Sequence, residues 1–237
     1  MTKSKKILAI VLAVIFTAVT VFLGFLFFKI IPDINKQKEH QAQVKQYYLD
    51  KVALFEEENK SLSPGEIDVV FLGDSLTDLY DLKTYYPQYK TLNRGIGADT
   101  TFGLEDRLKV SVYDVKPKVA VMLIGVNNIN TMFDNYEDIL KGFKTNIPNT
   151  KIVLLSLTAL GGDLWGERNQ LSCYNNVKIK KLAEEYGYSF VDLYTPLFDA
   201  RTGEVREGLT VDGGHFTHEG YLILTEQITP VLESLLN

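Results

Sequence analysis

Apolar and polar positions divide the chain into an apolar N-terminal run, a polar stretch, and a long alternation of short apolar runs with amphipathic stretches. Five of the short runs have the length of buried strands and are apolar almost throughout. Such continuous runs are typical of parallel strands in a sheet that is covered on both faces. The five predicted strands are Ile67–Gly73, Tyr89–Gly95, Lys118–Gly125, Lys151–Ala159 and Tyr188–Tyr194.

Helical spacing of apolar residues separates or follows these strands. The predicted helices are Thr101–Val115, Tyr136–Asn146, Leu171–Tyr186 and His218–Leu236. Strand and helix in turn predict an α/β fold of three layers, in which helices cover both faces of a doubly wound, parallel, five-stranded sheet. A chain of 237 residues is long enough to bury such a core without disulfides or metals.

The apolar N-terminal run, Ile7–Phe28, has no charged residue, and two threonines are its only polar side chains. As a helix of roughly 33 Å it would cross the apolar core of a bilayer. Lys3, Lys5 and Lys6 precede it, so the positive-inside rule places the N-terminus in the cytoplasm and the rest of the chain outside the cell. A cleaved signal peptide stays the alternative, although its apolar region is usually only about 7–15 residues long and no A-x-A site follows. We therefore predict an uncleaved, single-pass anchor in the cell membrane.

The polar stretch that follows, residues 33–59, is rich in Lys, Gln and Glu. Tyr48, Val52 and Phe55 recur in it at helical spacing, which predicts a stalk helix that docks on the domain near its C-terminal end. The sequence SLSPGE at residues 61–66 then breaks the helix. The predicted organisation is a basic tip with a transmembrane anchor at 1–31, a stalk at 32–65 and one globular domain at 66–237.

Charge and cysteine content exclude several classes of function. After Lys29 the chain carries 30 acidic and 21 basic residues, a formal charge of −9. An acidic domain is a poor candidate for binding nucleic acid or an anionic lipid surface. Cys173 is the single cysteine, which excludes an internal disulfide and a zinc site built from several thiolates. On its predicted helix, Cys173 is expected to be a small buried residue.

Polar residues and glycines follow four of the predicted strands, at the edge where doubly wound sheets bind their ligands. The four segments are Gly73–Ser75, NRGIGADTT at Asn93–Thr101, GVNN at Gly125–Asn128, and TVDGGHFTHEGY at Thr210–Tyr221. Together they supply a hydroxyl, backbone amides, an asparagine, and an aspartate with a histidine. These are the components of acyl transfer: a nucleophile, oxyanion donors, and a base with its orienting carboxylate.

Each residue type suits its step. Ser75 is a weak nucleophile at neutral pH and needs a base, for which histidine is suited because its pKa lies near neutrality. A carboxylate on the other ring nitrogen fixes the tautomer. Asp212 and His215 are separated by two glycines, whose permissive backbone allows both side chains to point to one place. Backbone amides near Ser75 and in the Gly95–Ala98 loop, and the side-chain amide of Asn127, can donate to an oxyanion.

These four segments resemble the conserved blocks of the SGNH hydrolase family, also called the GDSL esterase/lipase family. GDSLT resembles the first block, and NRGIGADTT is close to the second block of platelet-activating-factor acetylhydrolase-like members. GVNN and DGGH resemble the third and the last. The resemblance covers roughly Glu66–Leu236 and implies a flavodoxin-like SGNH fold.

The resemblance also implies roles for individual residues. Ser75 is the implied nucleophile, and Asp212 and His215 complete the triad. Ser75, Ala98 and Asn127 are the implied oxyanion-hole residues. Ala98 departs from the family, which usually has glycine there. Alanine keeps the N–H, so the donor can survive, but only if the backbone does not need a positive φ at this position. Gly97 beside it is able to take up the strain.

Other readings of single residues stay open beside this one. Taken alone, Ser75 could simply cap a helix. His215 with His218 does not have the H-E-x-x-H spacing, so neither a metal nor a cofactor is expected. The GIGADTTFG segment lacks the third glycine of a dinucleotide-binding loop. Asp74 is expected to tie neighbouring loops together. Trp165 could line the substrate pocket or serve only in packing.

The sequence therefore predicts a membrane-anchored, extracellular serine esterase whose ester substrate is a small molecule, a glycan or a lipid. The location favours O-acetyl groups on cell-envelope glycans as the substrate. The alternatives are a lysophospholipase or short-chain lipase, an O-acyltransferase, and a surface binding module with weak or no catalysis. No nucleic-acid partner is expected, and the pattern does not indicate an oligomeric state.

Overall fold

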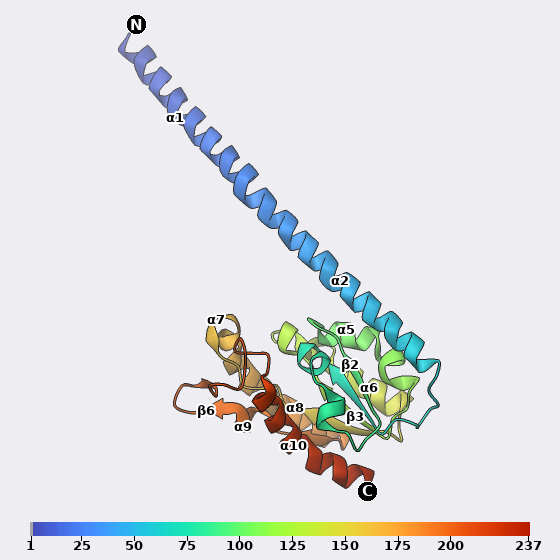
Figure 1. The fold of residues 1–237 in the computed structure, drawn as a ribbon. Coiled ribbons are helices and arrows are strands. Elements are labelled where there is room, and N and C mark those ends of the chain that lie inside the picture. Colours follow the sequence, from blue (N-terminus) through green and yellow to red (C-terminus); the bar gives the residue numbers. More distant parts are fainter. Residues whose placement is uncertain (1) are drawn as a thin grey trace. The chain divides into compact units, whose positions relative to one another are not determined.

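The computed structural model describes residues 2–237 and divides into two units, one ending at Gln46 and one spanning Tyr47–Asn237 (Figure 1). Helix α1 (Lys3–Phe25) leads through a π-helical turn at Leu26–Ile30 into α2 (Ile31–Asn59). Within the described residues, the continuous helix Lys3–Asn59 is the one whose length and apolar composition would suit a membrane span, and no residue of its most apolar stretch is buried.

The second unit is built on a sheet of five parallel strands in the order β2-β1-β3-β4-β5. The strands are β1 (Val69–Gly73), β2 (Thr91–Gly95), β3 (Val119–Leu123), β4 (Lys151–Leu155) and β5 (Ser189–Val191). All five predicted strands are confirmed, and each is shorter than its apolar run. The apolar runs extend beyond the strands because the segments that leave the sheet also carry buried apolar residues, such as Ile124, Leu157 and Ala159.

Three of the four predicted helices agree closely with helices of the structure. They are α6 (Tyr136–Asn146), α8 (Asn169–Tyr186) and α10 (His218–Leu236). The helix predicted at Thr101–Val115 is instead α5 (Thr101–Asp106) followed by a π-helical segment, Lys109–Tyr113. The chain breaks between them at Arg107, whose side chain turns into the interior.

Several short elements were not anticipated. They are α3 (Ser75–Asp78), α4 (Leu82–Tyr85), α7 (Gly162–Trp165), α9 (Tyr194–Leu197), the hairpin of β6 (Phe198–Asp199) and β7 (Glu204–Val205), and three 3₁₀ turns at Val126–Asn128, Met132–Asp134 and Gly166–Arg168. Elements of two to four residues are too short to show a helical or alternating apolar period.

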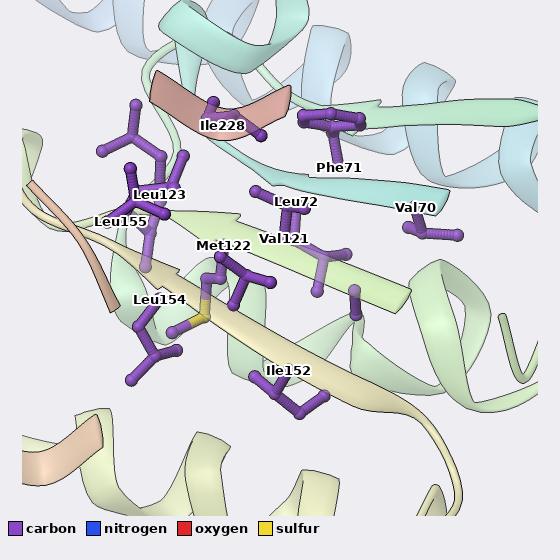
Figure 2. Close-up of a cluster of buried hydrophobic side chains, with 14 of the residues drawn as sticks. Val70, Phe71, Leu72, Val121, Met122, Leu123, Ile152, Leu154, Leu155 and Ile228 are labelled. Carbon is purple, nitrogen blue, oxygen red and sulfur yellow. The ribbon is translucent and has the colours of Figure 1, made fainter. Parts of the chain in front are cut away.

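The core is formed by apolar side chains on both faces of the sheet. Figure 2 shows Phe71 of β1 on the side covered by Ile228 of α10, and Ile152 and Leu154 of β4 on the opposite side. Side chains alternate between the faces of a strand, so continuous apolar strands supply both interfaces. On the α10 side, the Tyr221 hydroxyl also donates to the Leu76 carbonyl oxygen, 2.9 Å away. This bond joins α10 to α3.

A second, smaller cluster joins α2 to the sheet domain. Phe55, Ile96 and Val110 form it, with Tyr48 and Val52 packed against it. The residues singled out by their helical spacing therefore lie on the face of α2 that packs. Phe55 is 1% exposed.

The expectation that Cys173 is buried was wrong, because Cys173 is exposed on α8. The buried residues of this helix include Ser172, Ile179 and Leu182. Successive residues of a helix are about 100° apart around its axis, so the position after Ser172 turns away from the core.

Candidate active site

Strand β1 delivers Ser75 to the carboxyl edge of the sheet. The strand ends at Gly73, where a Cβ atom would meet Thr77 Oγ1 at 2.2 Å and the Leu123 carbonyl oxygen at 2.3 Å. Asp74 then caps α3, its carboxylate accepting a hydrogen bond of 3.1 Å from the Leu76 N–H. Ser75 is therefore the first residue of α3, and its side chain is partly exposed.

Asp74 is itself buried, with 1% of its surface exposed. Burial raises the pKa of its carboxyl group to about 7, against the opposing effect of the Leu76 N–H. Its hydrogen bond caps α3 beside Ser75, which is a structural role but a local one, whereas the sequence led us to expect that Asp74 ties neighbouring loops together.

The three residues expected to form a triad lie in one hydrogen-bonded chain. Ser75 Oγ is 2.9 Å from His215 Nε2, and His215 Nδ1 is 2.8 Å from Asp212 Oδ2. With Nδ1–H donating to a carboxylate, Nε2 presents its lone pair to the serine hydroxyl. Two backbone N–H groups, of Gly214 and His215, also donate to Asp212 Oδ1 at 3.0 and 2.8 Å.

These hydrogen bonds keep Asp212 ionised. Partial burial acts to raise the pKa of Asp212, but the hydrogen bonds from the His215 backbone, its ring and the Gly214 N–H outweigh it. The pKa of Asp212 consequently lies well below its ordinary value. A charged carboxylate can both orient the His215 ring and stabilise the imidazolium form.

The two glycines between Asp212 and His215 have separate roles. Gly213 has φ +91°, and a Cβ atom there would lie 1.9 Å from the Gly161 carbonyl oxygen. A Cβ atom at Gly214 would lie 2.7 Å from the Trp165 ring. The first glycine therefore allows the left-handed backbone of a tight loop, and the second makes room for an indole.

Trp165 packs edge-to-face on the His215 ring, with centroids 5.5 Å apart and an interplanar angle of 85°. Within residues 2–237 its buried Nε1 has no hydrogen-bond partner of normal geometry, but it lies near enough to Asp212 to help lower the pKa of that carboxyl. Of the two roles left open by the sequence, packing against the histidine is the one visible in this structure.

The Ile96–Asp99 turn brings the Ala98 amide to the same edge. The Asp99 N–H donates to the Ile96 carbonyl oxygen at 3.1 Å, and Ala98 has φ +62°. The expectation that Gly97 takes up the strain was wrong, because the positive φ falls on Ala98 itself. Glycine is usual at the third position of a turn that needs positive φ, and alanine costs about 1–2 kcal/mol more there. Ala98 is exposed, and its N–H has no acceptor among residues 2–237.

Asn127 lies in the 3₁₀ turn that follows β3. Its Nδ2 donates to the Asp99 carbonyl oxygen at 2.8 Å, which ties the asparagine to the turn that carries Ala98. A primary amide has two N–H donors. One is used by Asp99, and the second can serve a ligand.

Arg107 organises this edge and was missed by the sequence reasoning. Its fully buried guanidinium binds Asp99 Oδ2 at 2.8 Å and the carbonyl oxygens of Arg94 and Gly73 at 2.8 and 3.0 Å. It therefore joins the ends of β1 and β2 to the Ala98 turn. An arginine within a helical pattern is usually solvated, so no local signal marks this one.

The other residues considered from the sequence lie apart from this chain of hydrogen bonds. His218 begins α10, and its Nδ1 is 2.7 Å from the Tyr85 hydroxyl. Within the described part of the chain, no group of three His, Cys, Asp or Glu side chains is arranged to hold a metal ion. A cavity of about 830 Å³ is lined by the β6–β7 hairpin and by Gly161 and Gly213.

Residues 71–223 match the GDSL-like Lipase/Acylhydrolase family, and this segment includes all the site residues described above. The match covers well over half of the chain. The chain belongs to this family. It is a serine ester hydrolase with the family's α/β fold, as the sequence predicted. No curated protein sequence matches the chain significantly.

Solved structures of similar proteins share this fold. A GDSL-like lipase from Bacteroides thetaiotaomicron VPI-5482 is 23% identical with a TM-score of 0.69, covering 77% of this chain and 97% of its own. A Streptococcus pneumoniae protein, described provisionally as a platelet activating factor, is 21% identical with a TM-score of 0.71, over 84% and 99%. The acetylxylan esterase Axe2 from Geobacillus stearothermophilus is 20% identical with a TM-score of 0.58, over 71% and 95%. The second of these gives partial support to the resemblance to platelet-activating-factor acetylhydrolase-like members.

Proposed function

We propose that Ser75, His215 and Asp212 form the catalytic triad of this esterase and hydrolyse esters through an acyl-enzyme. The observation that carries the proposal is the hydrogen-bonded chain from Ser75 Oγ to His215 Nε2 and from His215 Nδ1 to Asp212 Oδ2, with steps of 2.9 and 2.8 Å. As Oγ bonds to the carbonyl carbon, Nε2 takes the serine proton and then gives it to the leaving alcohol. In the second half-reaction, Nε2 takes a proton from water as the water oxygen bonds to the acyl carbon. Nε2 then gives that proton to Ser75 Oγ as the acyl–Oγ bond breaks, which releases the acid and restores Ser75.

The oxyanion formed in each half-reaction is held by the backbone N–H groups of Ser75 and Ala98 and by the side chain of Asn127. This assignment is supported by the Ala98 N–H, which lacks an acceptor among residues 2–237, and by the second N–H of the Asn127 amide. Donors held in place before the reaction need no reorganisation during it. Losing one such donor typically lowers kcat by about 10²–10³.

The substrate we propose is an O-acetyl group on a glycan of the cell envelope. Residues 1–31 hold the enzyme in the membrane with the N-terminus inside, residues 32–65 are the stalk, and residues 66–237 are the hydrolase domain outside the cell. The long apolar helix supports the anchor. The fold shared with acetylxylan esterases supports a small acyl group on a polysaccharide.

Replacing Ser75 with alanine tests the triad. Hydrolysis of p-nitrophenyl acetate by the full-length protein in detergent should fall by at least about 10⁴-fold, because the nucleophile is gone. Ser63→Ala, the same chemical change in the loop after α2, should leave the rate unchanged. A Ser75→Ala enzyme that retained the wild-type rate would exclude this mechanism.

A series of p-nitrophenyl esters from acetyl to palmitoyl tests the substrate class. Preference for acetyl supports deacetylation, whereas preference for palmitoyl supports a lysophospholipase or lipase. Acetyl transfer to a glycan acceptor in preference to water would indicate an acyltransferase. A fluorophosphonate that failed to label Ser75 in the folded protein would indicate a binding module.

A further inference from the structure

One carboxylate joins three segments beside the proposed site. Asp78 is the last residue of α3, three positions after Ser75, and only 11% of its side chain is exposed. Its Oδ1 accepts a hydrogen bond from Lys51 Nζ at 2.8 Å, and its Oδ2 accepts from the Tyr47 hydroxyl at 2.6 Å. Oδ2 also accepts from the Gly97 N–H at 2.9 Å. Tyr47 and Lys51 belong to α2, and Gly97 is the neighbour of Ala98.

The same part of α2 supports the Ala98 turn through apolar contacts. Ile96, the first residue of the turn, is completely buried in the cluster that it forms with Phe55 and Val110. The Tyr48 hydroxyl donates to the Gly103 carbonyl oxygen at 2.9 Å, which fixes α2 against α5 just beyond the turn (Figure 1). The segment Tyr47–Asn59 therefore packs against the turn at Ile96 and is hydrogen-bonded to α5 at Gly103.

The turn needs such support because its backbone is strained. A non-glycine residue at positive φ persists only where its surroundings determine the conformation. Ala98 has φ +62°, and the amides on each side of it are fixed, Gly97 by Asp78 and Asp99 by Ile96. Releasing the Gly97 amide leaves the Ala98 peptide free to relax away from the strained geometry.

The phenol and the ammonium hold the carboxylate in different ways. Lys51 and Asp78 form an ion pair of 2.8 Å, and their side chains are 21% and 11% exposed. Burial, together with the hydrogen bond to Asp78, raises the pKa of Tyr47 to about 12, so the phenol stays a donor at the pH of an esterase assay. Both groups are hydrogen-bonded to Asp78, and within the part of the chain that the structure describes neither is hydrogen-bonded to Ser75 or His215.

We propose that Asp78 is a positioning residue for the oxyanion site. Tyr47 and Lys51 hold the Asp78 carboxylate in place, so the last turns of α2 are needed for full activity. The proposal rests on the oxyanion role proposed above for Ala98. Because α2 is the continuation of the apolar helix, this support lies on the helix that follows the segment we propose as the membrane anchor, and it begins 16 positions after Ile31. Displacing Tyr47–Asn59 is then expected to lower the rate of acylation rather than substrate binding.

Substitutions on α2 test this in the full-length protein. In Tyr47→Phe and Lys51→Met, kcat for p-nitrophenyl acetate should fall about tenfold, part of the loss expected for a whole oxyanion donor. KM should stay within about twofold of wild type, since an interaction made only in the transition state is weakened. Lys51→Arg should restore most of kcat. Asp78→Asn should lose more than either, because an amide cannot accept all three hydrogen bonds.

Matched controls separate positioning from folding. Tyr174→Phe on the exposed face of α8 and Lys60→Met beyond the end of α2 make the same chemical changes and should leave kcat unchanged. Rates are expressed per active site, titrated to completion with a fluorophosphonate, so unfolded protein is not counted.

Wild-type kcat per titrated site in both Tyr47→Phe and Lys51→Met would overturn the inference while leaving the triad intact. A loss confined to KM would overturn it too. An active Ser75→Ala enzyme would instead remove the triad on which it rests. Should Asp78→Asn not fold, the two α2 variants decide the question alone.

Discussion

Two loops lie with Ser75 at the carboxyl edge of the sheet, and they are held in different ways. The Asp212–His215 loop is held mainly by its own residues: the Asp212 carboxylate accepts both the Gly214 and His215 N–H groups, and glycine occupies the position of positive φ. From outside the loop, the Gly161 N–H donates to the Gly213 carbonyl oxygen at 2.9 Å, and Trp165 packs on His215. The Ile96–Asp99 turn has alanine at its positive φ. Its supports come from elsewhere in the chain, including Asp78, Arg107 and Asn127.

The difference separates two ways of making a precise site. A loop stabilised mainly by contacts within four residues depends little on the positions of distant side chains. A strained turn stabilised by distant side chains keeps its shape only while those side chains stay in place. The charge-bearing half of the proposed catalytic machinery is thus largely self-contained, and the oxyanion half depends on α2, α3 and α5.

The largest effect should come from the carboxylate of the self-contained loop. Asp212→Asn leaves the size of the side chain unchanged but favours the wrong histidine tautomer, so kcat should fall by about 10⁴-fold. The matched control is Asp192→Asn, which alters an acid that caps another strand end through Tyr194 and Thr195. A loss of less than tenfold in Asp212→Asn would show that the loop does not orient the base.

The same substitution should have a pH-dependent effect on stability. The pKa of Asp212 in the folded protein lies well below the ordinary value of 3.8, so ionised Asp212 stabilises the fold above that pH. This contribution is lost as the pH falls through the folded-state pKa. The difference in unfolding free energy between wild type and Asp212→Asn, measured in urea, should therefore shrink as the pH is lowered below 4.

The backbone of the self-contained loop predicts the next effect. Gly213→Ala should lower the free energy of unfolding by about 3 kcal/mol, because it combines an unfavourable φ with an impossible contact. A Cβ atom there lies 1.9 Å from the Gly161 carbonyl oxygen. Gly203→Ala is the matched control: φ is +77°, with no atom within 4 Å of the new Cβ, so only the φ cost of about 1 kcal/mol applies. Equal losses in urea unfolding would contradict the close contact with Gly161.

The contrast also explains what could be predicted from the sequence. The strand centres followed from continuous apolar runs, and the Asp212–His215 pairing followed from a spacing of three residues with glycines between. Both signals are local. Asp78 and Arg107 acquire their roles only when residues 31 and 13 positions away, Tyr47 and Arg94, are brought beside them by the fold. The periodicity of a single sequence does not predict contacts between residues that are far apart in the chain.

The prediction that Gly97 would take up the backbone strain was wrong for a related reason. A glycine beside an alanine suggested that Gly97 would adopt the unusual backbone, yet the hydrogen bond from the Asp99 N–H to the Ile96 carbonyl oxygen fixes the turn so that Ala98 is its third residue. The register of the turn decides which residue has positive φ. That register depends on Ile96 being buried under Phe55, which lies 41 residues earlier in the chain.

The smallest effect should come from relieving this strain. Ala98→Gly keeps the N–H donor and removes a Cβ from a residue with φ +62°. The greater entropy of glycine in the unfolded chain offsets part of the strain that is relieved, so the free energy of unfolding should rise by about 0.5–1 kcal/mol. With the turn still held by Asp78 and Asn127, kcat should stay within about twofold of wild type. Lys116→Gly provides the control, because Lys116 is exposed, has φ +48° and lies outside the site, and it should gain similar stability with no change in kcat. A rise in kcat of more than tenfold in Ala98→Gly alone would mean that the alanine holds its amide away from the oxyanion, and that the supports from α2, α3 and α5 do not compensate for the missing glycine.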